Sequence, residues 1–172
     1  MVACHRLCLP RSRCRFSGLV HSEFGGGRFP TGEINLYAAL LQGVAFVERL
    51  CFDSLDTLGA SIGGDLIFTG GATRSRYWCQ LRADILGRPV RLPENPEPAL
   101  GMAVLAASKG RNISERRVSD VAREMVRIRE VVTPRPDCVA RFHEPYLRLV
   151  EELARRGWIQ PALREHAVRR AQ

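Results

Sequence analysis

A strand-like run that stops at two glycines and then leads into a helix-like segment constrains the fold of this chain more than any other feature. The apolar run is residues 66–69, the glycines are Gly70 and Gly71, and the helix-period segment closes at Gly87. Glycines let the backbone approach a ligand because no Cβ stands in the way. The first turn of a helix adds unpaired N–H groups and the positive end of a dipole, which suit a phosphate. The stretch therefore predicts a strand, a tight turn and a helix start. The turn either binds a phosphate or simply connects the strand to the helix.

Periodicity along the rest of the chain indicates an α/β domain. In the helix after the glycines, Trp78, Leu81 and Ile85 share one face at three- and four-residue spacing. Thr31 is expected to cap the first helix and Gly59 to end it. We expect residues 133–137 to break the chain before the last helix and the Arg-rich tail to fray. The expected helices cover residues 33–58, 75–86, 99–108, 114–130 and 139–156, and the expected strands cover 66–69 and 89–92.

Composition and charge exclude several classes of protein. The 172 residues suffice for one domain, and no window holds eighteen uninterrupted apolar residues, so we expect no membrane partner. The net charge of +8 comes from 25 Arg and a single Lys, and it divides equally between residues 1–30 and 31–172. Such lopsided use of Arg is typical of a GC-rich genome, and no recognition motif accompanies it. We therefore expect no nucleic-acid partner.

Residues 1–30 differ from the rest of the chain. They mix Cys, Arg and Pro without a helical or strand period. The spacing of Cys4, Cys8 and Cys14 fits no standard zinc finger, although His5 and His21 keep a zinc site open as an alternative. No apolar core follows the basic residues, as a targeting peptide would require. We interpret this segment as a disordered, non-native leader. The other three cysteines, Cys51, Cys79 and Cys138, are expected to be small buried residues, and the even number of cysteines would permit disulfides.

Several blocks in a fixed order resemble a known family. They are residues 35–46 (NLYAALLQGVAF), 70–75 (GGATRS), 78–80 (WCQ) and 97–103 (EPALGMA). Together they resemble the C-terminal domain of the FGGY carbohydrate kinases, which are ATP-dependent sugar kinases. The resemblance implies a partial RNase H-like (actin-like ATPase) domain with two parallel strands and several helices, without the family's first strands. It divides the chain into a leader at 1–30, a domain fragment at 31–158 and a basic tail at 159–172.

The resemblance also implies a nucleotide site. Its expected residues are Gly70, Gly71, Ala72, Ser75, Gln42 and Gly43. The expected cofactors are ATP and Mg²⁺, and the expected partner is an adenine nucleotide. The resemblance to cytosolic kinases also implies that the cysteines are free thiols. Each residue keeps a structural alternative: a plain turn for the glycines, a helix N-cap for Ser75, and packing for Gln42 and Gly43.

No residue qualifies as a catalytic base. Asp84 lies more than two helical turns from the ligand turn and is expected to be a structural hydrogen-bond acceptor. Glu94 and Glu97 are interpreted as loop and helix-start acids, and His143 and His166 as surface residues. The expected function is therefore the ATP-binding part of a cytoplasmic sugar or polyol kinase that is inactive alone, since the sugar site lies elsewhere in the full-length family. A non-catalytic remnant or interaction module from a disrupted kinase gene is the alternative.

Overall fold

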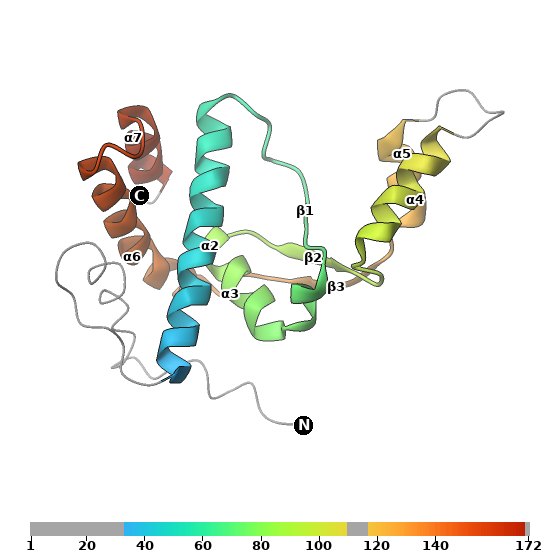
Figure 1. The fold of residues 1–172 in the computed structure, drawn as a ribbon, viewed down its shortest axis with the longest axis horizontal. Coiled ribbons are helices and arrows are strands. Elements are labelled where there is room, and N and C mark those ends of the chain that lie inside the picture. Colours follow the sequence, from blue (N-terminus) through green and yellow to red (C-terminus); the bar gives the residue numbers. More distant parts are fainter. Residues whose placement is uncertain (1–32, 110–116, 171–172) are drawn as a thin grey trace. The chain divides into compact units, whose positions relative to one another are not determined.

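The computed structural model describes residues 33–109 and 117–170, and these fall into two compact units. Unit 1 comprises residues 33–64, 84–87 and 135–170, and unit 2 comprises 65–83, 88–109 and 117–134. The expectations for residues 1–30 lie outside the described residues, as does the cap at Thr31. Figure 1 shows the order of helices and strands along the chain.

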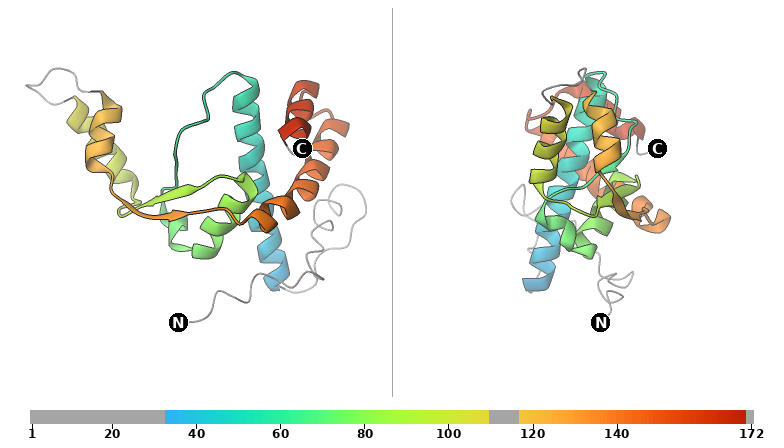
Figure 2. Two further views of the ribbon diagram at one scale, coloured as in Figure 1. Left: turned by 180° about the vertical axis from the view of Figure 1, so that it is seen from behind. Right: turned by 90° about the vertical axis from the view of Figure 1, so that its right-hand side faces the viewer.

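Unit 1 is built from three helices: α2 (Glu33–Thr57), α6 (Pro136–Arg155) and α7 (Pro161–Arg170). Helix α7 packs against both α2 and α6, and Figures 1 and 2 show the three side by side. The core is aromatic at its centre. The Phe46 ring meets Phe142 edge-on at 6.2 Å between centroids and Tyr146 at 5.9 Å, a geometry that favours aromatic pairs.

Helix α2 ends as the sequence predicts. Gly59 takes a left-handed φ of 77°, which glycine adopts without a steric penalty. Its N–H donates to the Asp56 carbonyl at 3.0 Å, and the N–H of Ala60 donates to the Leu55 carbonyl at 3.0 Å. These two bonds form a Schellman motif and satisfy carbonyls at the helix end.

Unit 2 is built around a three-stranded sheet in the order β1-β2-β3. Strand β1 (Leu66–Ile67) pairs with β2 (Val90–Pro93) in parallel, and β2 pairs with β3 (Ile128–Val132) antiparallel. Between β1 and β2 lie the 3₁₀ turn η2 (Gly71–Arg74) and helix α3 (Arg76–Leu86), whose last residues, 84–86, belong to unit 1. Helices α4 (Pro98–Ser108) and α5 (Val118–Met125) follow β2 and contact each other.

The α/β class, the first three expected helices and the two parallel strands are confirmed. The segment 114–130 was expected to be helical throughout, which is wrong: α5 ends at Met125 and β3 begins at Ile128. Three of the five residues of β3 are β-branched, and their pairing with β2 outweighs the helix-like charge pattern. The sheet is therefore mixed rather than parallel only.

Four smaller expectations need correction. Strand β1 has only two residues, neither fully buried, although the neighbouring Phe68 is buried. The proline segment does not merely break the chain, because Pro136 begins α6 and its missing N–H costs nothing there. The tail does not fray: residues 161–170 form α7. Cys79 and Cys138 are buried free thiols as expected, whereas Cys51 is exposed.

In the part of the chain that the structure describes, no helix combines the length and the apolar character needed to cross a membrane.

Candidate functional site

The turn that follows β1 is held in shape by Gly70 and Thr73. Gly70 has φ 85° and ψ 172°, a region that only glycine occupies readily. Its N–H donates to the Pro96 carbonyl at 2.7 Å. Its own carbonyl accepts the Thr73 N–H at 3.1 Å and the Thr73 hydroxyl at 2.8 Å. Thr73 is buried, so these two hydrogen bonds hold the turn on the side that faces the core.

Gly71 and Ala72 form the outer side of this turn, and both are exposed. They are the first two residues of the 3₁₀ turn, where no earlier turn supplies carbonyl partners for their N–H groups. A Cβ placed on Gly71 would meet no atom within 4 Å, and the φ of Gly71 is not positive. The left-handed backbone therefore belongs to Gly70, while Gly71 contributes open space beside exposed N–H groups.

Ser75 caps helix α3, which confirms the structural interpretation of this residue. Its Oγ accepts the Trp78 N–H at 3.3 Å, and its carbonyl accepts the Cys79 N–H at 3.0 Å. A hydroxyl that accepts one bond can still donate another. Capping and a ligand contact are therefore compatible.

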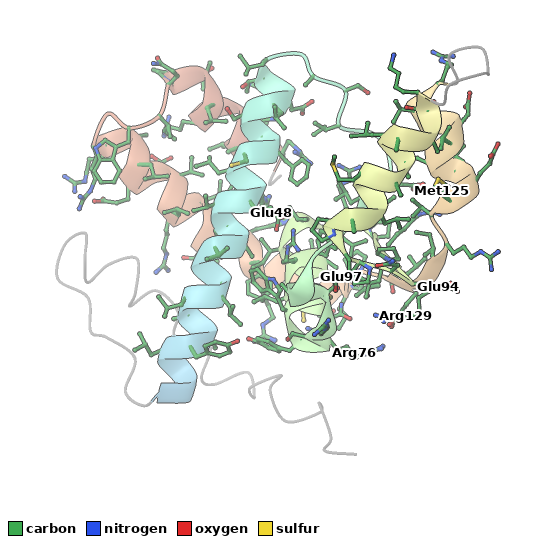
Figure 3. The ribbon with its side chains drawn as sticks, turned by 45° about the vertical axis from the view of Figure 1, so that its right-hand side comes forward. Glu48, Arg76, Glu94, Glu97, Met125 and Arg129 are labelled. Atoms are coloured by element: carbon green, nitrogen blue, oxygen red, sulfur yellow. The ribbon has the colours of Figure 1, made fainter. Side chains whose placement is uncertain are left out.

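Charged side chains lie near the turn within unit 2. Arg74 Nη2 lies 3.3 Å from Glu97 Oε1, and both side chains are well exposed. An exposed pair of this kind contributes little to stability, so an incoming anion can compete with Glu97 for Arg74. Glu97 is also the N-cap residue of α4, as the sequence predicts for a helix-start acid. In Figure 3, Glu94 and Glu97 mark the loop after β2.

Gln42 and Gly43 lie on α2 and therefore in unit 1, whereas residues 70–75 belong to unit 2. Gln42 is buried. A Cβ placed on Gly43 would meet no atom within 4 Å. The structure thus brings Gly70, Gly71, Ala72 and Ser75 together in one turn of unit 2. Gln42 and Gly43 belong to unit 1.

Asp84 is a structural acceptor, as expected. The carboxylate is fully buried and receives the Arg135 backbone N–H at 2.8 Å, the Arg135 Nε at 3.0 Å and its Nη2 at 2.5 Å. Arg135 is the N-cap residue of α6. Asp84 thus joins the end of α3 to the start of α6 and is not placed to act as a base.

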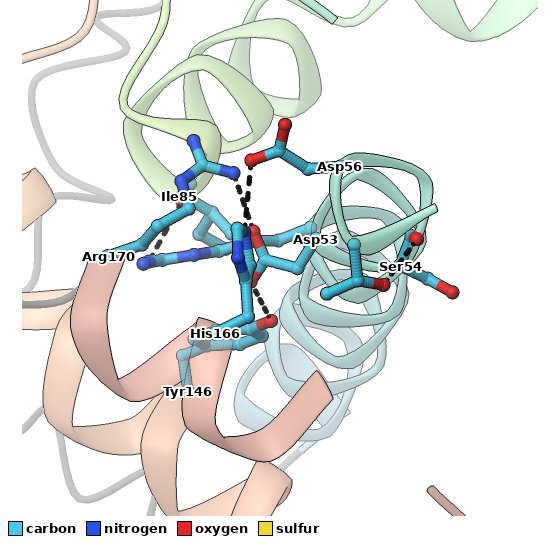
Figure 4. Close-up of polar contacts among 9 residues, drawn as sticks. Asp53, Ser54, Asp56, Ile85, Tyr146, His166 and Arg170 are labelled. Atoms are coloured by element: carbon cyan, nitrogen blue, oxygen red, sulfur yellow. Dashed lines mark hydrogen bonds and ion pairs between the residues drawn. The ribbon is translucent and has the colours of Figure 1, made fainter. Parts of the chain in front are cut away.

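A second buried carboxylate, Asp53, was not foreseen from the sequence. The Tyr146 hydroxyl donates to its Oδ2 at 2.5 Å, and Arg170 Nη1 lies 2.6 Å from its Oδ1 (Figure 4). Burial, and then the hydrogen bond and charge of Asp53, raise the pKa of Tyr146 far above its usual value. The phenol therefore stays protonated, and the group is a structural link between α2, α6 and α7.

His166 belongs to the same region and corrects the expectation that it lies free on the surface. Its Nε2 lies 3.0 Å from Asp56 Oδ2, and only a small part of its side chain is exposed. The signal in the sequence was an aspartate pair, Asp53 and Asp56, close to the end of an apolar-rich helix. The partners of these aspartates lie about a hundred residues further along the chain, and a local sequence pattern cannot predict contacts at such separations.

Residues 33–109 and 117–170 contain no group of three His, Cys, Asp or Glu side chains that could hold a metal ion. Magnesium is commonly bound by one or two carboxylates together with substrate phosphates.

Comparison with known proteins consistently identifies one family of enzymes. The sequence model described as "FGGY family of carbohydrate kinases, C-terminal domain" matches residues 10–109, so the match begins inside the segment 1–30 and ends before α5. The human "FGGY carbohydrate kinase domain-containing protein" is 32% identical over 120 residues, which are 67% of this chain and 21% of that protein. "Ribulokinase" from Mycolicibacterium smegmatis is 28% identical over 127 residues, covering 73% of this chain and 22% of the relative.

A solved structure agrees with these relatives. The xylulose kinase from Rhodospirillum rubrum matches with a TM-score of 0.56 and 31% identity, covering 77% of this chain and 28% of that one. The chain spans about a fifth of the length of the human and Mycolicibacterium smegmatis relatives.

Proposed function

Because the chain belongs to the FGGY family of carbohydrate kinases and carries part of the C-terminal domain, we propose that it supplies the nucleotide-binding side of an ATP-dependent sugar or polyol kinase. The observation that carries this proposal is the turn at residues 70–75. It lies within the segment that the family model matches, and it exposes Gly71 and Ala72 at the start of a helical turn.

Each residue of the turn has a proposed role. Gly70 sets the backbone in a conformation that other residues avoid. The N–H groups of Gly71 and Ala72 face the phosphates, where the missing side chain of Gly71 lets oxygen atoms approach. Ser75 adds a hydroxyl donor at the start of α3 while it caps that helix. Gln42 and Gly43 lie on α2 in unit 1, and a nucleotide role for them rests on the family resemblance alone.

Phosphoryl transfer needs phosphate binding, a metal ion and a group that accepts the proton of the attacking hydroxyl. The described residues offer the first of these. Asp84 is occupied by Arg135 and Asp53 by Tyr146 and Arg170, so neither buried acid is available as a base. When bound, Mg²⁺ would supply charge neutralisation on the phosphates. We therefore propose that the chain alone does not phosphorylate sugars, and that turnover requires the remainder of a kinase.

Membership of the FGGY kinase family also supports a cytoplasmic location. Within the described residues, Cys51, Cys79 and Cys138 are free thiols. Free cysteines are typical of a reducing compartment, where ATP-dependent sugar kinases also operate.

Ligand-observed NMR with magnesium ATP and magnesium ADP tests the proposal. We expect weak binding, with a Kd of roughly 1 mM, since only part of the pocket is present. Gly71→Val should remove the saturation-transfer signal because its side chain would fill the space beside the exposed N–H groups. Gly63→Val makes the same change at an exposed glycine that is also free of close neighbours, and it should bind like the wild type. Equal signals from the two variants, or sugar-dependent ADP release by the pure chain, would contradict the proposal.

A further inference from the structure

The turn at residues 70–75 contains one charged side chain, Arg74. Arg74 is the last residue of η2 and directly precedes Ser75, which caps α3. The phosphate contacts proposed above come from backbone N–H groups and a hydroxyl, so none of them carries a full positive charge. A guanidinium presents a planar fork of N–H donors that matches the oxygen atoms of a phosphate. Arg74 therefore has both the chemistry and the position in the chain of a further phosphate contact.

The ion pair that Arg74 makes with Glu97 is a loose one. A single contact of 3.3 Å joins Arg74 Nη2 to Glu97 Oε1. Charge-assisted hydrogen bonds of good geometry are shorter, at about 2.7–2.9 Å. Arg164 and Glu151 of unit 1 show the tighter form, in which Arg164 Nε lies 3.0 and 2.9 Å from the two carboxylate oxygens. Because an exposed single-contact pair contributes little to stability, a phosphate can replace Glu97 on Arg74 at little cost.

The backbone keeps Glu97 beside the turn whether or not the ion pair is made. The Gly70 N–H donates to the Pro96 carbonyl at 2.7 Å, and the Glu97 N–H donates to Asn95 Oδ1 at 3.0 Å. Glu97 is the N-cap residue of α4, yet its carboxylate makes no capping hydrogen bond to the described first turn of that helix. Figure 3 shows Glu97 in the loop after β2. The carboxylate is therefore held where it pairs with Arg74, and it is not needed to cap α4.

The charges of the pair oppose each other at the proposed phosphate site. While Glu97 holds the guanidinium, the positive charge of Arg74 is neutralised, and the carboxylate repels an anion. We infer that Arg74 is a phosphate-binding residue of the turn and that Glu97 is a built-in competitor, which occupies the guanidinium until the phosphates of a magnesium nucleotide displace it. This inference rests on the proposed function, because it takes the ligand from that proposal.

Substitutions at the two residues should change nucleotide affinity in opposite directions. The ¹⁵N-labelled chain is titrated with magnesium ADP at constant ionic strength, and the Kd is taken from the amide shifts of residues 70–75. Glu97→Gln should tighten binding by about two- to fivefold, and Arg74→Gln should weaken it by about three- to tenfold. The control is Asp65→Asn, which removes the same charge from a second exposed pair of unit 2, with Arg91 at 3.2 Å. It should leave the Kd unchanged, because Asp65 precedes β1 whereas the turn follows it.

The double variant separates competition from simple repulsion. In the Arg74→Gln background, Glu97→Gln should tighten binding by less than about twofold, because no guanidinium remains to be released. A gain as large as in the wild-type background would overturn the inference, as would an unchanged Kd in either single variant. In those cases, shifts at residues 70–75 of the wild type leave the proposed function standing. If these amides move neither in the wild type nor in Glu97→Gln, both the inference and the proposed function are wrong.

Discussion

At the scale of single residues, the two adjacent glycines of the turn have different roles. Gly70 lies in a backbone region that is closed to residues with a Cβ, whereas Gly71 lies in open space with an ordinary φ. The sequence predicts the turn from the pair but does not say which glycine takes the unusual conformation. That assignment depends on the bond from the Gly70 N–H to Pro96, a contact 26 residues away.

The difference between the glycines gives a paired stability prediction. Gly70→Ala should lower the free energy of unfolding of unit 2 by about 1–3 kcal/mol, the usual strain for this region. Gly71→Ala should change it by about 0.5 kcal/mol or less. The chain has one tryptophan in each unit, so urea unfolding followed by Trp78 fluorescence in a Trp158→Phe background reports on unit 2. Equal losses in the two variants would show that the described backbone of the turn is wrong.

His143 on α6 gives a prediction of pH dependence. Burial, and then the positive charge of Arg49, lower the pKa of His143 below its ordinary value of 6.5. The unfolded chain therefore takes up a proton before the folded one does, and stability falls as the pH drops through about 6.5 towards the folded pKa. Above about pH 6.5, His143 does not make the free energy of unfolding depend on pH. His143→Gln should flatten the decline below about pH 6.5 in urea titrations, and an unchanged slope would contradict the role of this residue.

Some residue roles follow from sequence and others do not. The cap at Ser75, the helix end at Gly59 and the structural role of Asp84 come from local spacing, and all three are confirmed. The partners of Asp53 lie 93 and 117 residues away, so only the folded chain identifies them. The roles of Gln42 and Gly43 remain predictions, because they depend on a ligand.

At the scale of elements, one buried carboxylate joins the three helices of unit 1. Asp53 of α2 accepts the Tyr146 hydroxyl from α6 and pairs with Arg170 at the end of α7. This contact explains why the basic tail is helical rather than frayed. A basic composition suggested a solvated end, but burial of Ala167 and the pairing of Arg170 fix it on α2.

The link at Asp53 predicts a large loss of stability on substitution. Asp53→Ala should lower the free energy of unfolding of unit 1 by about 3–5 kcal/mol, because it leaves the polar groups of Tyr146 and Arg170 without their partner. Tyr146→Phe should cost less, about 1–2 kcal/mol, since one hydrogen bond to a charged group is lost. Glu151→Ala removes an exposed pair with Arg164 and should cost about 0.5 kcal/mol or less. Trp158 fluorescence in a Trp78→Phe background measures all three, and a loss at Asp53 no larger than at Glu151 would contradict the account.

Strand β3 shows why element type was harder to predict than element position. The residues 114–130 carry charges at helical spacing, yet Ile128, Val131 and Val132 are β-branched and find a partner strand in β2. Periodicity reports the local preference of a segment. Pairing with a strand more than thirty residues earlier decides its final state, as the register of Val90 with Val132 shows.

At the scale of the whole molecule, the chain carries part of the C-terminal domain of the FGGY kinases, and its described residues fall into two compact units. Unit 2 carries the turn that we propose to bind phosphates, and unit 1 carries the three helices joined at Asp53. The family and the α/β class follow from the sequence because the motif blocks keep their order. Which sugar is phosphorylated does not follow, because the chain spans only about a fifth of its curated relatives.

The most direct test of the central claim is to map the nucleotide on the chain. In ¹⁵N-labelled protein titrated with magnesium ADP, we expect the amide signals of residues 70–75 to shift progressively, and to stay in place in Gly71→Val. The Gly63→Val control should reproduce the wild-type shifts, since Gly63 belongs to unit 1 and a Cβ placed on it would meet no atom within 4 Å. If the amides of residues 70–75 do not move in the wild type, or move equally in Gly71→Val, the turn does not bind nucleotide and the family relationship describes ancestry alone.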